Sequence, residues 1–151
     1  MVDCSAEGFA QAMDISAHSC LRMMRGAEPL MATGGTCRTV SFPGASRVFV
    51  NHNVMGLVKA ALERAVRYAA SKLAAKDIRL PPQSPGPIGT RATSGIADCD
   101  AHPSDAVERA LIGRGVTIED AGALATFLAL PESRNMTGGV HRVDPGVSIT
   151  A

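Results

Sequence analysis

The stretch over residues 53–76 constrains the fold more than any other part of the sequence. It contains no proline and many Ala, Leu, Glu, Arg and Lys residues, which are the types with high helix propensity. We therefore predict one long helix here. Because alanine is frequent on its apolar face, that face favours close packing against another helix. The apolar residues recur at helical spacing: Val54, Leu57, Val58, Ala61, Leu62, Ala65 and Val66, extended by Tyr68, Leu73 and Ala74.

The residues before this helix predict a shorter helix followed by a strand. Apolar residues recur near helical spacing over residues 5–25, and Gly26 starts a stretch rich in residues that break helices. Residues 36–41 are β-prone and lie between Gly35 and Pro43, a pattern that is typical of a short strand.

The residues after the long helix predict a strand, a long loop, two helices and a final strand. Residues 78–80 suit a short buried strand that a proline pair ends. Residues 83–104 are rich in Pro, Gly, Ser and Thr, and a loop of this length inside a compact domain is usually functional or disordered. The remaining elements are predicted at residues 104–112, at residues 117–130, where Thr117 and Asp120 form a capping-box-like pattern, and at residues 140–143.

The order of these elements indicates the fold class. Helices and strands alternate along the chain, which argues for a parallel sheet covered by helices. A chain of 151 residues suits one domain with one core. We therefore expect an α/β fold in a single domain over residues 1–151, with a short parallel sheet of about three strands flanked by helices.

The charge and the aromatic content exclude some classes of partner. The formal net charge is +1 at pH 7, which gives no strong field for attracting nucleic acid or a membrane surface. Aromatic residues make up 3% of the chain, so stacking on bases is not expected. No apolar run approaches the ~20 residues of a membrane-spanning helix. We therefore expect neither nucleic acid nor a membrane as a partner.

The cysteine pattern and the N-terminus favour a cytoplasmic protein. Cys4, Cys20, Cys37 and Cys99 form no CxxC motif and show no zinc-finger spacing to a histidine, so no metal site is expected. Free, buried thiols in a reducing compartment are the expectation instead. The N-terminal residues have neither the basic nor the apolar region of a secretory signal.

Four motifs give the sequence a more specific character. Residues 27–80 read AEPLMATGGTCRTVSFPGASRVFVNHNVMGLVKAALERAVRYAASKLAAKDIRL, and residues 84–96 read SPGPIGTRATSGI. Residues 115–122 read GVTIEDAG, and residues 137–146 read TGGVHRVDPG. In this order, the motifs resemble the C-terminal part of the NADH-dependent enoyl-acyl-carrier-protein reductases of the short-chain dehydrogenase/reductase superfamily. The resemblance extends over nearly the whole chain.

The resemblance implies a partial Rossmann-like three-layer fold, NADH as the cofactor, and reduction of an enoyl thioester in fatty acid biosynthesis. Lys59 matches the lysine that holds the nicotinamide ribose hydroxyls, a role that suits an ammonium with several donors. Pro87, Ile88 and Thr90 match the segment that passes the nicotinamide and the pyrophosphate. Without the resemblance, Lys59 reads as a solvated helix lysine and Ile88 as a core residue.

The resemblance also implies a substrate pocket and a subunit interface. Met55, which can equally be a core residue, matches a residue that lines the pocket. Phe42 falls at the position of a second active-site tyrosine. The 83–104 loop, with Ile96, resembles the lid over the acyl chain. The 53–76 helix resembles the one that family members use between subunits, so a homo-oligomer through this helix and an acyl thioester substrate are expected.

One departure from the family pattern affects the catalytic groups. His52 stands where the family has its catalytic tyrosine, on the same helix face as Lys59. The tyrosine hydroxyl donates a hydrogen bond to the thioester carbonyl as enolate charge develops, and a histidine can also donate. A nearby Lys59 ammonium disfavours the protonated form of His52. Phe42 offers no polar atom, and the single tyrosine, Tyr68, matches a structural position.

A second departure concerns the cofactor phosphates. Family members begin with a strand, a glycine-rich turn and a helix N-terminus that hold the pyrophosphate. Here Gly34 and Gly35 precede a predicted strand rather than follow one, so they do not fit that motif. Without the family's preceding strand, the sheet is expected to expose an unpaired edge, which invites pairing or aggregation.

Several functions remain open at this point. The first is an enoyl reductase that uses His52 and Lys59, with a second polypeptide supplying the cofactor half. The second is a non-catalytic, truncated homologue that acts as an oligomerisation or regulatory partner. The third is a gene remnant without a selected role. Hydrolysis by a pair of His52 and Ser41 is a weaker alternative, because no G-x-S-x-G motif accompanies it.

Overall fold

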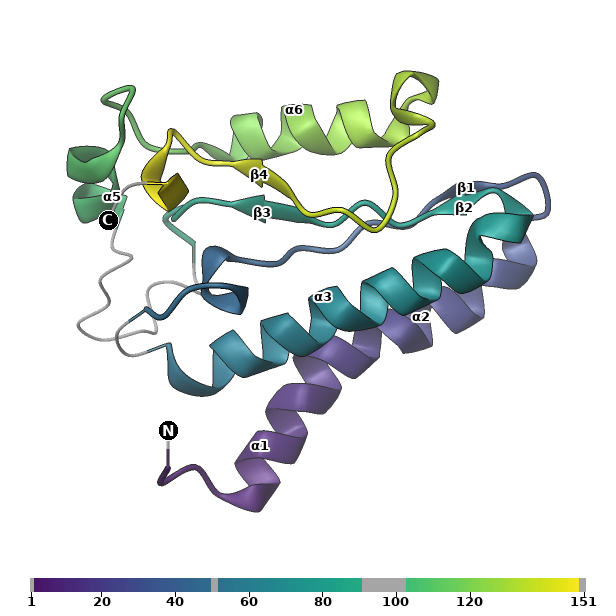
Figure 1. The fold of residues 1–151 in the computed structure, drawn as a ribbon, viewed down its shortest axis with the longest axis horizontal. Coiled ribbons are helices and arrows are strands. Elements are labelled where there is room, and N and C mark those ends of the chain that lie inside the picture. The colour runs from purple at the N-terminus through teal and green to yellow at the C-terminus, as the bar shows by residue number, and fades with distance from the viewer. Residues whose placement is uncertain (1, 50–51, 91–102, 150–151) are drawn as a thin grey trace.

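The structure is a computed structural model, and it describes residues 2–49, 52–90 and 103–149. Extended segments form a thin layer in the middle of the molecule, with helices on both of its faces (Figure 1). The paired helices α2 (Ser19–Ala27) and α3 (Asn53–Leu73) cover one face, and α6 (Ile118–Ala129) covers the other. This arrangement confirms the predicted α/β class, with a short parallel sheet flanked by helices.

The first helical region contains a wider turn in its middle. α1 (Ala6–Met13) begins after Ser5, whose Oγ accepts a hydrogen bond from the N–H of Gly8 at 3.0 Å. A π-helical turn over Asp14–His18 then leads into α2. The helix predicted over residues 5–25 is therefore present, but it is not a single regular α-helix.

The long helix predicted over residues 53–76 is confirmed. α3 is followed by a 3-10 turn at Ala74–Lys76, and Asp77 then adopts the left-handed conformation with a φ of 54°. The buried side chains of α3 recur three and four residues apart: Val58, Leu62, Val66, Ala70 and Leu73. Together with Ala17, Met24, Ile78 and Leu80 they form the hydrophobic core. The core therefore lies between the paired helices and the strand layer.

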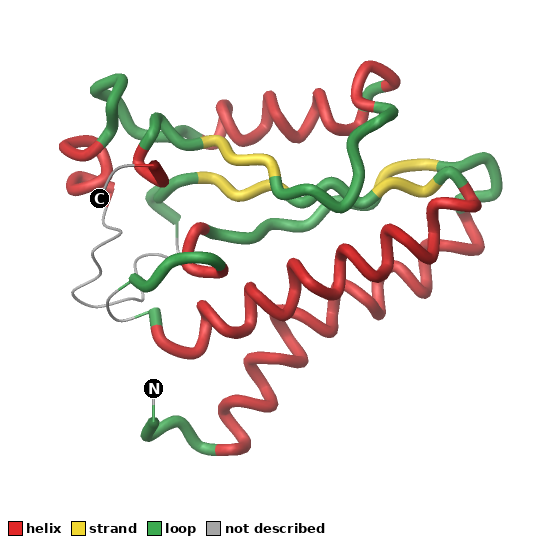
Figure 2. The backbone as a smooth tube through the Cα atoms, viewed as in Figure 1, coloured by secondary structure: helices red, strands yellow, loops and turns green. Residues whose placement is uncertain are grey.

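The sheet consists of two short parallel ladders. β1 (Gly35–Thr36) pairs with β2 (Ile78–Arg79), and β3 (Gln83–Pro85) pairs with β4 (His141–Val143). A single bridge between Val40 and Gln83 connects the two ladders. The segments over residues 35–41 and 78–85 therefore run side by side, as the smooth trace in Figure 2 shows.

A proline pair divides the second extended segment. Pro81 and Pro82 have no N–H to donate to a ladder, so β2 ends before them. Pairing resumes at Gln83, whose N–H donates to the carbonyl of Thr39 at 3.0 Å. The first residues of the predicted 83–104 loop therefore form β3, which corrects that part of the prediction.

The other predicted elements are present with shifted ends. Regular strand structure in the 36–41 segment is limited to β1, and the later residues of the segment pair singly with their neighbours. The helix predicted over residues 104–112 is α5 (Pro103–Arg109). α6 has the predicted capping box, in which Thr117 Oγ1 accepts the N–H of Asp120 at 3.2 Å and Asp120 Oδ2 accepts the N–H of Thr117 at 3.0 Å.

The cysteines differ from the expectation of buried thiols. Cys4 is exposed, and Cys20 and Cys37 are only partly buried, although burial still raises the pKa of both Cys20 and Cys37. Cys99 lies outside the described residues. Within the described ranges, none of the helices has the length and apolar character that crossing a membrane requires.

Candidate functional site

A cavity of about 620 Å³ opens beside the first turns of α3. Its walls come from segments that are far apart in the sequence, including residues 40–43, the start of α3, residues 83–90 and the turn after β4. Most of its lining is apolar, with a few polar groups among the apolar ones. A concave site of this composition is typical of small-molecule binding.

The residues predicted from the resemblance meet in this cavity. Met55 and Lys59 are four positions apart and share one face of α3, whereas His52 is the N-cap residue just before this helix. All three line the cavity. Ile96, the remaining predicted substrate residue, lies outside the described residues. The cavity is also lined by the other predicted residues: Phe42, Pro87, Ile88 and Thr90.

His52 packs against two phenylalanine rings, which also contact each other. Its ring stacks on Phe42 with centroids 5.1 Å apart and planes 26° apart, and Phe49 meets its edge at 5.7 Å and 65°. These contacts restrict the orientation of the imidazole. A neutral histidine carries one N–H donor and one nitrogen acceptor, so His52 has the means to donate a hydrogen bond to a carbonyl in the cavity.

Lys59 is half-buried, and its ammonium has a partner within the chain. Nζ donates a hydrogen bond to the carbonyl oxygen of Val40 at 2.7 Å. Burial lowers the pKa of Lys59 from its usual value of 10.5. An ammonium has three N–H groups, and Val40 takes one of them in the described part of the chain, which leaves two for a ligand with adjacent hydroxyls.

The carbonyl of Val40 lies on an open edge of the sheet. Residues on either side of Val40 bond to Gln83, because the Gln83 N–H donates to Thr39 and the Ser41 N–H donates to Gln83. In a parallel pair the intervening residue points its N–H and carbonyl the other way. The sequence analysis expects an unpaired edge of the sheet here, and Lys59 donates a hydrogen bond to one of the backbone carbonyls at this edge.

Ser41 is engaged by a glutamate rather than by His52. Ser41 is 2% exposed, and its Oγ donates to Glu63 Oε1 at 2.6 Å. A hydroxyl has a single proton to donate. The hypothetical hydrolytic pair of Ser41 and His52 therefore lacks its hydrogen bond, which corrects that alternative.

Two polar residues of the cavity escape sequence reasoning. Gln83 Oε1 and Asp144 Oδ2 are buried and have no hydrogen-bond partner in the described part of the chain. Asp144 uses its other oxygen, Oδ1, to accept the N–H of Gly146 at 3.1 Å. Buried acceptors without donors are unfavourable, so an amide or hydroxyl donor of a ligand would stabilise them. The only sequence feature that could have identified Asp144 as a site residue is its place in the TGGVHRVDPG motif. No sequence feature identifies Gln83.

Comparison with known proteins identifies relatives over almost all of the chain. The family model described as Enoyl-(Acyl carrier protein) reductase matches residues 1–148. Enoyl-[acyl-carrier-protein] reductase [NADH] 2 of Rhizobium meliloti is 42% identical over 149 residues, which are 99% of this chain and 56% of the relative. The NADH-dependent reductase of Synechocystis sp. is 43% identical over 150 residues, which are 97% of this chain and 57% of the relative. The chain thus spans about half the length of the curated relatives that it matches.

Solved structures share the fold. The enoyl-acyl carrier protein reductase of Bacillus cereus, solved with NADP+ and indole naphthyridinone, has a TM-score of 0.95 and 39% identity, and the match covers 99% of this chain and 58% of that one. The reductase of Anaplasma phagocytophilum in complex with NAD has a TM-score of 0.93 and 37% identity, with coverage of 99% and 57%. Since the family model spans nearly every residue, this chain belongs to the enoyl-(acyl carrier protein) reductase family.

Proposed function

We propose that this chain supplies the substrate and nicotinamide side of an enoyl reductase site, at which an enoyl thioester is reduced with NADH in fatty acid biosynthesis. The supporting observation is that His52, Lys59 and residues 87–90 converge on one apolar cavity. An acyl chain is apolar and its thioester carbonyl is polar, which suits an apolar cavity with a few polar groups.

The polar groups of the cavity suit the nicotinamide end of NADH. Gln83 and Asp144 present buried oxygen acceptors, and the carboxamide and ribose of a nicotinamide nucleoside both offer donors. Lys59 would hold the ribose hydroxyls with the N–H groups that Val40 does not use. Pro87, Ile88 and Thr90 would flank the nicotinamide. Bound NADH would supply the hydride.

His52 would act as the hydrogen-bond donor to the thioester carbonyl. Negative charge accumulates on that oxygen during the reduction, and an N–H aimed at it stabilises the charge. Phe42 and Phe49 restrict the imidazole, so the donor is oriented before the substrate binds. Phe42 and Met55 would contact the acyl chain, with Ile96 in the lid above it.

The pyrophosphate end of NADH needs groups from elsewhere. The sequence contains no G-x-G-x-x-G fingerprint, and it spans 56% of the length of the Rhizobium relative. We therefore propose that a further polypeptide segment, in the same chain or in another one, completes the cofactor site.

A non-catalytic role in self-association is the second candidate. Large apolar side chains are exposed on the helices of the paired-helix layer, with Leu57 at 44% and Met23 and Tyr68 at 73% each. Exposed apolar side chains that gather on one surface mark interfaces. We propose that the chain forms a homo-oligomer through the 53–76 helix, in the cytoplasm, and this role requires neither His52 nor Lys59.

Titration of the purified chain with NADH by calorimetry separates the two candidates, with the oligomeric state measured by light scattering on the same sample. The reductase role predicts saturable binding that Lys59→Met weakens. Lys72→Met is the matched control, because Lys72 is an exposed lysine near the other end of α3. Absence of binding by a folded sample, both alone and mixed with the remaining part of a relative, would overturn the reductase role. A concentration-dependent oligomer in that sample would support the second candidate.

A further inference from the structure

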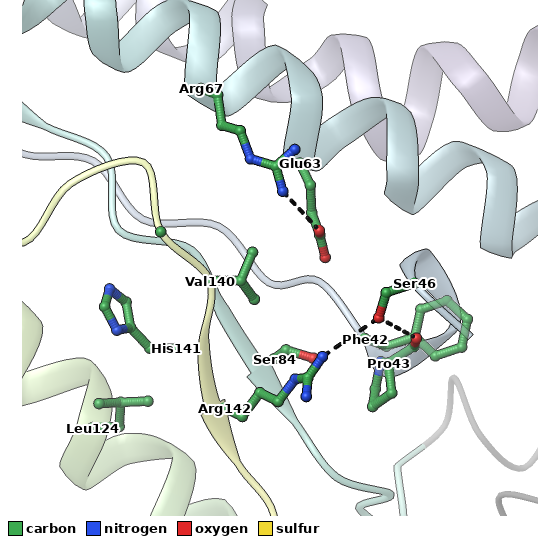
Figure 3. Close-up of a pocket in the computed structure, with 11 residues that line it drawn as sticks. Phe42, Pro43, Ser46, Glu63, Arg67, Ser84, Leu124, Val140, His141 and Arg142 are labelled. Atoms are coloured by element: carbon green, nitrogen blue, oxygen red, sulfur yellow. Dashed lines mark hydrogen bonds and ion pairs between the residues drawn. The ribbon is translucent and has the colours of Figure 1, made fainter. Parts of the chain in front are cut away.

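A second cavity, of about 650 Å³, shares Phe42 and Pro43 with the first one. Its lining comes from α3, β3, β4 and α6, so it lies along β4 between the two helices, as Figure 3 shows. We name this second cavity the edge groove. The side chains and the glycine that give it its chemical character are Ser46, Glu63, Arg67, Ser84, Gly139 and Arg142.

Positive charge predominates in the edge groove. The guanidinium groups of Arg67 and Arg142 share it with one carboxylate, that of Glu63. This carboxylate is already engaged, since Oε1 accepts the Ser41 hydroxyl at 2.6 Å and Oε2 lies 3.6 Å from Arg67 Nη2. The side chain of Glu63 is also only 12% exposed. The groove therefore keeps a net positive charge that its own residues do not neutralise.

The hydrogen bonds that Arg142 makes with other described residues are long. Its Nη1 lies 3.4 Å from Ser148 Oγ, and its Nη2 lies 3.5 Å from Ser46 Oγ, both beyond the usual range for N–H···O bonds. The ion pairs formed among residues 2–49, 52–90 and 103–149 involve other cations. A guanidinium has five N–H donors, so most of the donors of Arg142 are available to a ligand.

Ser84 contributes a buried hydroxyl that has no partner. Ser84 is 1% exposed, and its Oγ makes no hydrogen bond within the described part of the chain. The register of β3 and β4 sets Ser84 opposite Arg142, so both side chains lie on the same face of the sheet. A buried hydroxyl is unfavourable unless something satisfies it. An acceptor bound beside Arg142 would do so.

The open side of β4 adds a backbone donor. The N–H of His141 donates to the carbonyl of Pro82 at 2.9 Å, so His141 faces β3. The next residue of a parallel ladder points its N–H the other way, and the N–H of Arg142 therefore faces the open side. Gly139 borders the groove where even an added Cβ would meet no atom within 4 Å, so the approach from this side is open.

We propose that the edge groove binds an oxyanion, the phosphate or carboxylate group of a small molecule. Both groups pair bidentately with a guanidinium and accept a hydrogen bond from a hydroxyl. Arg142 and Arg67 supply the charge, and the Ser84 hydroxyl fixes one oxygen. The site is distinct from the reductase cavity, and it does not depend on the reductase function proposed above.

Calorimetric titration of the 151-residue chain with inorganic phosphate and with acetate tests this site, with chloride balancing the ionic strength. We expect saturable binding of one anion per chain. Tighter phosphate binding assigns a phosphoryl ligand, and tighter acetate binding assigns a carboxylate ligand. Absence of saturable binding for both anions, together with an unfolding temperature that neither anion raises, would overturn the proposal.

One variant and its matched control locate the site. Arg142→Gln should weaken binding about tenfold or more, because it removes a charge-assisted contact. Arg64→Gln is the matched control, since Arg64 is exposed on α3 outside the groove. This variant should bind the anion as tightly as the unchanged chain does. Undiminished binding by Arg142→Gln would overturn the proposal.

Ser84→Ala gives an independent readout. Because the hydroxyl has no partner, its removal should leave the thermal unfolding temperature of the anion-free chain unchanged or higher, while the stabilisation by added anion shrinks. A lower unfolding temperature together with full stabilisation by the anion would contradict the role given to Ser84. This comparison needs no calorimetric signal, so it holds even where the heat of binding is small.

Discussion

Replacing Leu62 by alanine should cause a large loss of stability. Leu62 is 1% exposed and lies one turn from Val58 and Val66, which are equally buried. The substitution removes the transfer free energy of the leucine side chain and leaves a cavity. The core around Leu62 is built from helices and from the paired strand β2, whose backbones limit how far the side chains can move, so the cavity closes only partly. We therefore expect a loss of about 3–4 kcal/mol. For a chain of this size, that loss lowers the unfolding temperature by about 10 °C.

Leu57→Ala is the matched control, because Leu57 is on the same helix but 44% exposed. Circular dichroism should follow thermal and urea unfolding of both variants at several protein concentrations. In the isolated chain, Leu57→Ala should cost less than about 1 kcal/mol, as exposed substitutions do. An equal loss in both variants at every concentration would refute the burial pattern of α3. A loss in Leu57→Ala that grows with protein concentration would instead indicate that its face is covered by a second copy.

Four further predictions concern a charge, a helix cap, a turn and a glycine inside a helix. The unchanged chain should gain stability as the pH rises from the lowered pKa of Lys59 to 10.5, because in this range the unfolded chain still holds a proton that the folded chain has lost. Urea unfolding across this pH range should show the gain for the unchanged chain and no such gain for Lys59→Met. Thr117→Ala removes the N-cap of α6 and should cost about 1 kcal/mol in urea unfolding, whereas Thr126→Ala, in the exposed interior of the same helix, should cost less. Gly34→Ala should destabilise the chain by about 1–3 kcal/mol, because Gly34 has a φ of 83° and an added Cβ would lie 2.8 Å from the Asp77 carbonyl oxygen. Gly122→Ala, inside α6 with open space around it, should stabilise the chain by up to about 1 kcal/mol in the same assay.

Elements with a local signal were predictable from the sequence. α3 follows from helix propensity and a repeating apolar face, and the start of α6 follows from the spacing of Thr117 and Asp120. Strand limits were less predictable, because a ladder depends on a partner that is distant in sequence. β3 begins inside the Pro-rich stretch that reads as a loop, since Gln83 can pair with the 35–41 segment once the proline pair has passed.

The same distinction separates the two cavities. Met55 and Lys59 share a face of α3 through helical spacing, and His52 is the N-cap residue of the same helix, so one short stretch of sequence was enough to place the three beside one cavity. The edge groove has no such motif. It exists because the register of β3 with β4 sets Ser84 opposite Arg142, and because α3 lays Glu63 and Arg67 over the same face. In the sequence, each of these residues looks like an ordinary surface or strand residue. Only the pairing of β3 with β4, which are more than fifty residues apart, brings them close enough to bind one ligand.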